Sequence, residues 1–114
     1  MNRHIYFYKN YFQTFYDEQT KEVKAKIDWT IDLIRQLSYI PQKYFKHIEG
    51  TDGLFEIRVD TSGNAYRVFC FFDEGNLVIV TNGFQKKTQK TPKDEIKRAL
   101  RIKKEYFDEK NGKY

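Results

Sequence analysis

The stretch LFEIRVDTSGNAYRVFCFFDEGNLVIVTNGF, residues 54–84, decides the fold of this chain. It contains three segments rich in Val, Ile, Phe and Tyr, a composition typical of strands, at residues 54–60, 65–72 and 77–84. Thr-Ser-Gly-Asn and Asp-Glu-Gly-Asn separate these segments, and both sequences favour tight hairpin turns. The sequence therefore predicts three consecutive antiparallel strands.

Further strand and helix patterns flank this stretch on both sides. Residues 3–8 are predicted to form a strand, residues 9–18 a short helix and residues 20–38 a longer amphipathic helix with apolar residues spaced one turn apart. A last helix is predicted to start with Thr91 as its N-cap and Pro92 as its first residue. The order βααβββα predicts an α+β fold: an antiparallel sheet with a helical hairpin on one face and a C-terminal helix.

Length and composition limit the class of protein. With 114 residues and 13.8 kDa, we expect a single domain over residues 1–114. No stretch approaches the roughly 20 apolar residues of a membrane span, and the N-terminus lacks the apolar region of a signal peptide. A single cysteine, Cys70, excludes a disulfide framework and a cysteine-based zinc site. We therefore expect a cytoplasmic protein without a membrane partner.

The positive charge is concentrated at the C-terminal end. The net charge is +5, and residues 84–114 hold 11 basic and 5 acidic side chains, whereas residues 1–83 hold 10 and 11. A basic segment on a nearly neutral body favours a polyanionic partner, and nucleic acid is the most common one. A solvated Lys-rich helix is the alternative, and charge alone does not separate the two.

The hairpin loops predict which residues lie opposite each other. The predicted pairs are Val59 with Tyr66, Ile57 with Val68 and Phe55 with Cys70 in the first hairpin, and Phe72 with Leu77, Cys70 with Ile79 and Val68 with Thr81 in the second. This register makes one face of the sheet almost wholly apolar, and a slip by one residue would reverse it. We expect that face to pack against the helical hairpin, with Cys70 as an inert core residue.

The opposite face of the sheet then places Arg58 directly across from Arg67. Two like charges opposite each other destabilise a sheet, so an anionic ligand between them is an attractive explanation. Alternatively, Glu56 neutralises the pair from one diagonal step away, and both interpretations can hold together. We expect both arginine side chains to be accessible to solvent.

Further basic and aromatic residues converge on this face. Lys86 and Lys87 follow Asn82 and Phe84 just after the strand predicted at residues 77–84. Lys46 and His47 precede the strand predicted at residues 54–60. For each lysine alone, a solubilising surface charge is the more common explanation. Together with the two arginines, however, they predict contacts to RNA phosphates, with the Phe84 ring stacking on a base.

Other chemistry finds no support in the sequence. It contains no P-loop, no dinucleotide-binding fingerprint and no nucleophile elbow. Its two histidines are far apart and have no neighbouring carboxylate cluster. We therefore expect neither a metal nor an organic cofactor.

Four blocks of the sequence are familiar. They are Phe45–Gly50 (FKHIEG), Gly53–Val59 (GLFEIRV), Tyr66–Phe69 (YRVF) and Asn82–Pro92 (NGFQKKTQKTP). In these blocks the chain resembles the RelE/ParE superfamily of type II toxins, and within it the HigB-like branch with its phage-derived members. The resemblance extends over nearly the whole chain.

This resemblance implies a function and a set of partners. Toxins of this kind cleave mRNA, mostly on the translating ribosome, and are neutralised by a cognate antitoxin with a helix-turn-helix domain. The antitoxin also represses the operon, so operator DNA is expected to be contacted only through it. Arg67 matches the arginine that contacts the scissile phosphate, Arg58 matches a basic position on the preceding strand, and Lys86 and Lys87 match the basic segment after the last strand.

The expected activity is therefore that of a metal-independent endoribonuclease. Arg67 and Arg58 would surround the phosphate, because a guanidinium matches its oxygens. Proton transfer falls to Lys86, Lys87, Glu56 or His47, and the sequence does not assign the acid and the base among them. The residues expected to contact RNA outside the reaction centre are Lys46, Asn82, Phe84, Gln85 and Lys90.

A function of another class stays open beside this one. The chain can be a non-catalytic basic module that occupies a nucleic acid or a protein, as the gyrase-poisoning branch of the superfamily does. Such a protein would arrest growth without cleaving RNA.

Overall fold

The structure, a computed structural model, describes residues 2–112. The elements are β1 (His4–Phe7), α1 (Tyr11–Asp17), α2 (Lys21–Gln36), β2 (Phe45–His47), β3 (Phe55–Thr61), β4 (Asn64–Phe72), β5 (Leu77–Lys86) and α3 (Lys93–Lys110). The predicted α+β class is confirmed. The short strand β2 is an addition, since that segment is irregular in the prediction. Within the described range, no helix is both long and apolar enough to cross a membrane.

The five strands form one mixed sheet in the order β1-β5-β4-β3-β2. Strands β2 to β5 are antiparallel to their neighbours, whereas β1 runs parallel to β5, with Ile5 opposite Val78. The expectation of a purely antiparallel sheet is therefore wrong at this edge. A parallel pair needs a long connection, and the two helices that follow β1 begin it.

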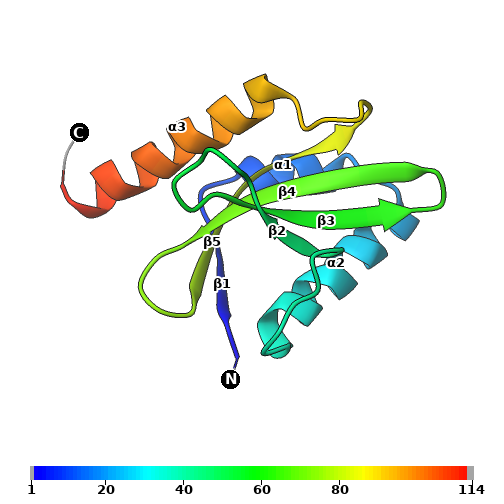
Figure 1. The fold of residues 1–114 in the computed structure, drawn as a ribbon, viewed down its shortest axis with the longest axis horizontal. Coiled ribbons are helices and arrows are strands. Elements are labelled where there is room, and N and C mark those ends of the chain that lie inside the picture. Colours follow the sequence, from blue (N-terminus) through cyan, green and yellow to red (C-terminus); the bar gives the residue numbers. More distant parts are fainter. Residues whose placement is uncertain (1, 113–114) are drawn as a thin grey trace.

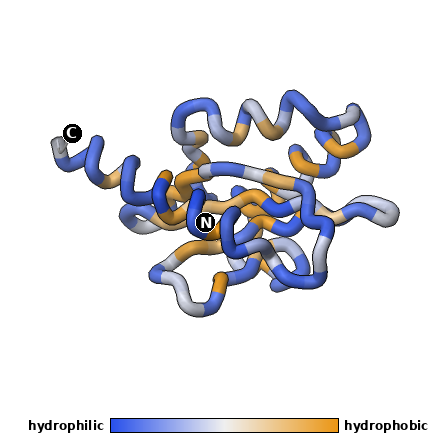
Figure 2. Tube along the Cα trace, turned by 90° about the horizontal axis from the view of Figure 1, so that it is seen from above, coloured by the Kyte–Doolittle hydropathy of each residue, from blue (hydrophilic) through white to orange (hydrophobic). Residues whose placement is uncertain are grey.

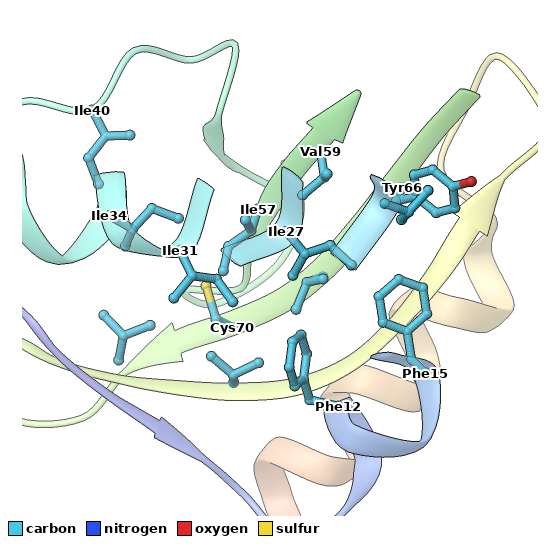
Figure 3. Packing of buried hydrophobic residues seen from close by; sticks show 14 residues of the cluster. Phe12, Phe15, Ile27, Ile31, Ile34, Ile40, Ile57, Val59, Tyr66 and Cys70 are labelled. Atoms are coloured by element: carbon cyan, nitrogen blue, oxygen red, sulfur yellow. The ribbon is translucent and has the colours of Figure 1, made fainter. Parts of the chain in front are cut away.

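Helices α1 and α2 cover one face of the sheet, as predicted. Thr20 begins α2 by accepting a hydrogen bond from the backbone N–H of Val23 on its side-chain oxygen, at 3.3 Å. Figure 3 shows how side chains of both helices meet the central strands: Phe12, Phe15, Ile27, Ile31, Ile34, Ile57, Val59, Tyr66 and Cys70. Cys70 is buried here as expected, and burial raises the pKa of its thiol.

Helix α3 lies on the other face of the sheet, and Figure 1 shows it on the side opposite α2. It buries Ala99 against Leu54 and Phe69, and Ile102 against Phe71 and Ile79. Figure 2 shows the hydrophobic residues mainly along the middle of the molecule, whereas the C-terminal helix is largely hydrophilic. Because α3 covers β4 and β5, only the β2–β3 side and the ends of the strands are left for a site on this face.

The first hairpin has the predicted register, and the second does not. Every predicted pair of β3 and β4 is confirmed, including Arg58 opposite Arg67. In the second hairpin, Phe72 lies opposite Val78 and Cys70 opposite Val80, each one residue later than predicted. Val78 and Val80 therefore belong to the α2-side core, and Ile79 belongs to the α3 side.

An irregularity in the β4–β5 pairing restores the predicted faces further along the strands. The register shifts between Val68 and Cys70, so that Val68 lies opposite Gly83 and Arg67 opposite Phe84. One extra residue in β5 reverses the side-chain alternation. Phe84 therefore lies on the same face as Arg67, as the sequence predicted.

Candidate functional site

Glu56 is the centre of the polar cluster on the β3–β4 surface. Its Oε1 lies 3.5 Å from Nε of Arg58 and 3.9 Å from Nε of Arg67. Alternation along β3 places Glu56 and Arg58 on one face, and the confirmed register adds Arg67 from β4. The carboxylate thus balances the two like charges, which is one of the two interpretations that the sequence allowed.

Arg67 is buried, so the prediction that both arginines are accessible is wrong for this residue. Its side chain is 4% exposed, against 27% for Arg58. Nη1 donates to Oδ1 of Asp60 and to the backbone oxygen of Tyr66, both at 2.9 Å. Nε of each arginine is buried without a hydrogen-bond partner among the described residues.

Thr91 has a different role from the predicted one. Helix α3 begins at Lys93, the N-cap position falls on Pro92, and no side chain caps the helix. The Thr91 hydroxyl donates instead to Oε2 of Glu56, at 3.1 Å. This bond ties the segment before α3 to the polar cluster formed by Glu56, Arg58, Asp60 and Arg67, named the arginine cluster.

Two adjoining pockets open beside the cluster. The first, named the Arg58 pocket, has a volume of about 530 Å³, and its lining includes Lys46, His47, Glu56, Arg58, Lys86 and Lys90. The second, named the Arg67 pocket, has a volume of about 640 Å³, and its lining includes Asp60, Asn64, Arg67, Gln85, Lys86 and Lys87. Lys86 and Gln89 line both, so the two pockets adjoin at the end of β5 and the segment after it.

The two pockets are basic as a whole. Their lining holds six lysines and arginines, and the acidic side chains among the same lining residues are Glu49, Glu56 and Asp60. Lys46 lies directly opposite Glu56 in the β2–β3 ladder. The structure thus brings together six of the predicted basic residues: Lys46, Arg58, Arg67, Lys86, Lys87 and Lys90.

His47 lies at the rim of the Arg58 pocket, on β2. Its Nε2 is 3.2 Å from the backbone oxygen of Thr51, and its ring stands edge-on to Phe55. Because a carbonyl oxygen only accepts, Nε2 carries the proton of the neutral ring and Nδ1 is left as a proton acceptor. Across residues 2–112, no group of three or more His, Cys, Asp or Glu side chains is arranged to hold a metal ion.

Three of the predicted RNA contacts lie elsewhere or are already occupied. Asn82 is buried under α3, where its amide donates to Glu95 and its oxygen accepts from Thr81. Phe84 is half-buried with its ring 5.6 Å from that of Phe69, so it belongs to the α3 core. Gln85 does line the Arg67 pocket, and its amide donates to Asn64.

The sequence prediction missed two residues of this site, Asp60 and Thr91. Asp60 follows Glu56 and Arg58 at a spacing of two, so the alternation that grouped those two would also have placed Asp60 on their face. Thr91 carries no such signal, because it lies 35 positions after Glu56 in an irregular segment.

Comparison with known protein families gives a match over most of the chain. The profile of the family described as "Phage derived protein Gp49-like (DUF891)" matches residues 14–104. The match includes α2, all of β2 to β5, both pockets and the first two thirds of α3. No curated protein matches the chain.

Proposed function

This chain belongs to the Gp49-like family of phage-derived proteins, and on that premise we propose that it is the toxin of a type II toxin–antitoxin system. The activity we propose is metal-independent cleavage of mRNA on the translating ribosome in the cytoplasm. The family groups with the RelE/HigB type II toxins, which supports this choice over an unrelated basic module.

The observation that carries the proposal is the placement of Arg58 opposite Arg67, with Lys86 lining both pockets. Guanidinium groups present paired N–H donors that match phosphate oxygens and stay charged at every physiological pH. A backbone phosphate can therefore lie over the cluster. Neighbouring nucleotides can enter the Arg58 pocket and the Arg67 pocket on either side of it.

Cleavage in this site would proceed by attack of the 2′-hydroxyl oxygen on the adjacent phosphorus. The new O–P bond closes a 2′,3′-cyclic phosphate, and the bond from phosphorus to the 5′-oxygen breaks. Arg58 and Arg67 stabilise the extra negative charge of the pentavalent phosphate. The 2′-hydroxyl gives its proton to a base, and the leaving 5′-oxygen receives one from an acid.

The contacts of the proton-transfer candidates favour a division of roles. Glu56 is occupied by Thr91 and both arginines, so we assign it to holding the guanidinium groups in place. Nδ1 of His47 has no hydrogen-bond partner among residues 2–112 and lies beside the Arg58 pocket, so His47 is our candidate for the base. Lys86, which reaches both pockets, is our candidate for the acid, with Lys87 beside it.

A basic surface of this kind calls for a partner that covers it. We propose a cognate antitoxin with a helix-turn-helix domain, through which alone the complex would contact operator DNA. Co-expression of the protein encoded beside this chain is then expected to relieve growth arrest.

The test is to incubate the purified chain with translating ribosomes and to map the new mRNA ends. The wild type is expected to cut translated mRNA, and a double variant with Lys86→Ala and Lys87→Ala to cut about 10²-fold more slowly. Both lysines lie at or near the surface, so this variant is expected to fold. Lys97→Ala, which removes an exposed lysine on α3, is the matched control and should cut like the wild type.

Two results contradict the proposal. If the double variant cuts at the wild-type rate, neither the end of β5 nor the segment after it is part of the reaction centre. If the wild type arrests growth and produces no new mRNA ends, the chain acts as a non-catalytic binder, the alternative that the sequence left open.

A further inference from the structure

The two carboxylates of the arginine cluster differ in how firmly they are held. Glu56 is 8% exposed, accepts the Thr91 hydroxyl and faces both arginines. Asp60 is 61% exposed and contacts Arg67 alone through Oδ1, within the part of the chain that the structure describes. We infer that Asp60 is a displaceable counter-ion, which occupies Arg67 in the free protein and leaves when a phosphodiester binds.

The position of Asp60 supports this inference. Asp60 and Arg67 line the same pocket, where the lining residues that the structure describes include no other acid. Away from Asp60, Nη1 of Arg67 also donates to the Tyr66 backbone oxygen, and the buried Nε lies beside Glu56. A ligand in this pocket therefore approaches Arg67 from the side on which Asp60 lies.

The chemistry of the two anions makes them competitors. A carboxylate oxygen and a phosphate oxygen accept hydrogen bonds from the same guanidinium N–H groups. Water around the exposed Asp60 carboxylate screens its attraction to Arg67 and can solvate the carboxylate once it has turned away. Rotation of the Asp60 side chain into water thus frees one N–H group of Nη1, while the bond from Nη1 to the Tyr66 backbone oxygen stays in place.

Displacement also changes the charge of the cluster. With both carboxylates in place, Glu56 and Asp60 balance Arg58 and Arg67. When Asp60 has turned away, the cluster carries one uncompensated positive charge, which a phosphodiester neutralises. Asp60 therefore lowers the affinity of the site for RNA and keeps Arg67 paired while the site is empty. This inference rests on the proposed function in that it takes RNA as the ligand.

The test measures binding without cleavage. The probe is a fluorescent oligoribonucleotide whose 2′-hydroxyls are methylated, so that the proposed reaction cannot occur. Its dissociation constant is measured by fluorescence anisotropy for the wild type, Asp60→Asn and Asp60→Glu. Asp60→Asn is expected to bind about 3- to 10-fold more tightly than the wild type, and Asp60→Glu, which keeps the charge, to stay near the wild type.

The control separates displacement from a general effect of charge. Glu49→Gln removes one negative charge from the Arg58 pocket, and Glu49 contacts neither arginine among the described interactions. If Asp60 competes directly with the phosphodiester, Asp60→Asn should tighten binding of the probe more than Glu49→Gln does. This difference in affinity should persist when added salt screens long-range attraction.

Three outcomes overturn the inference. In the first, Glu49→Gln lowers the dissociation constant as much as Asp60→Asn does. In the second, Asp60→Asn binds the probe more weakly than the wild type. In the third, neither the wild type nor Asp60→Asn binds the probe detectably. Weaker binding would mean that Asp60 orients Arg67 for the ligand. A wild type that cuts no mRNA, in contrast, contradicts only the proposed nuclease, since this measurement uses an uncleavable probe.

Discussion

At the scale of single residues, the site depends on one buried carboxylate between two guanidinium groups. Glu56 balances Arg67, which is almost completely buried, and Arg58, which is only partly so. A buried charge is tolerated when it is paired, and removing one partner leaves the other uncompensated. The residues that we assign to phosphate binding therefore also contribute to the stability of the fold.

This arrangement predicts unequal effects of the two arginines on stability. Arg67→Ala is expected to lower the free energy of unfolding by about 1–3 kcal/mol, because Glu56 loses a buried partner. Arg58→Ala should lower it by less than about 1 kcal/mol, because that side chain is more exposed. Urea denaturation measures both values. Arg101→Ala, on the exposed side of α3, is the control. If Arg67→Ala loses no more stability than this control, Arg67 does not have the proposed structural role.

At the scale of elements, strand β5 joins the core to the site. Its first half packs Val78 and Val80 under α2, and its end carries Lys86 to the pockets. Between them, Gly83 lies against the Phe15 ring of α1: a Cβ at this glycine would be 2.6 Å from Cδ2 of Phe15. Only a residue without a side chain allows helix α1 to lie this close to the strand.

A methyl group at this position should therefore disturb the contact between α1 and β5. Gly83→Ala is expected to lower the free energy of unfolding by about 1–3 kcal/mol through overpacking. Phe15→Ala removes the whole ring, including the Cγ and Cδ2 atoms that lie nearest to such a Cβ, and should relieve the clash. The loss in the double variant is thus expected to be smaller than the sum of the two single losses. Additive losses in urea denaturation would show that the two side chains do not compete for the same space.

At the scale of the whole molecule, helix α3 is anchored to the rest of the chain by polar contacts near its C-terminal end. Tyr106 donates to Oδ2 of Asp73 at 2.6 Å, and Lys110 donates to the same carboxylate at 2.9 Å. Asp73 belongs to the turn between β4 and β5 and is buried. Burial alone would raise the pKa of Asp73, but the two donors outweigh burial and hold the pKa below its ordinary value.

The sign of this shift predicts how stability depends on pH. A carboxyl group whose pKa is lower in the folded chain stabilises the fold above its unfolded pKa, near 4, and this contribution is lost as the pH falls through the folded pKa. Asp73→Asn is expected to cost about 1 kcal/mol at pH 7 and to reduce the loss of stability between about pH 5 and pH 2. Urea midpoints at several pH values measure this, with Asp52→Asn, an exposed carboxylate, as the control. An unchanged acid dependence would contradict the anchoring role of Asp73.

Local patterns predicted much of the candidate site. The spacing of Glu56, Arg58 and Arg67 on two strands joined by a tight loop is enough to bring them together, because a hairpin fixes the register of its strands. Lys86 was found for the same reason, since it directly follows a predicted strand. Asn82 and Phe84 were placed on the correct face, but α3 covers that part of it.

Residue periodicity and short loops were enough to predict the α+β class, the helical hairpin on one face and the first β-hairpin with its opposed arginines. The tertiary structure alone decided the parallel edge strand, the shifted β4–β5 register and the burial of Arg67. It also decided that the Thr91 hydroxyl bonds to Glu56. These features arise where segments distant in the chain meet, and there packing and hydrogen-bond satisfaction outweigh local preference.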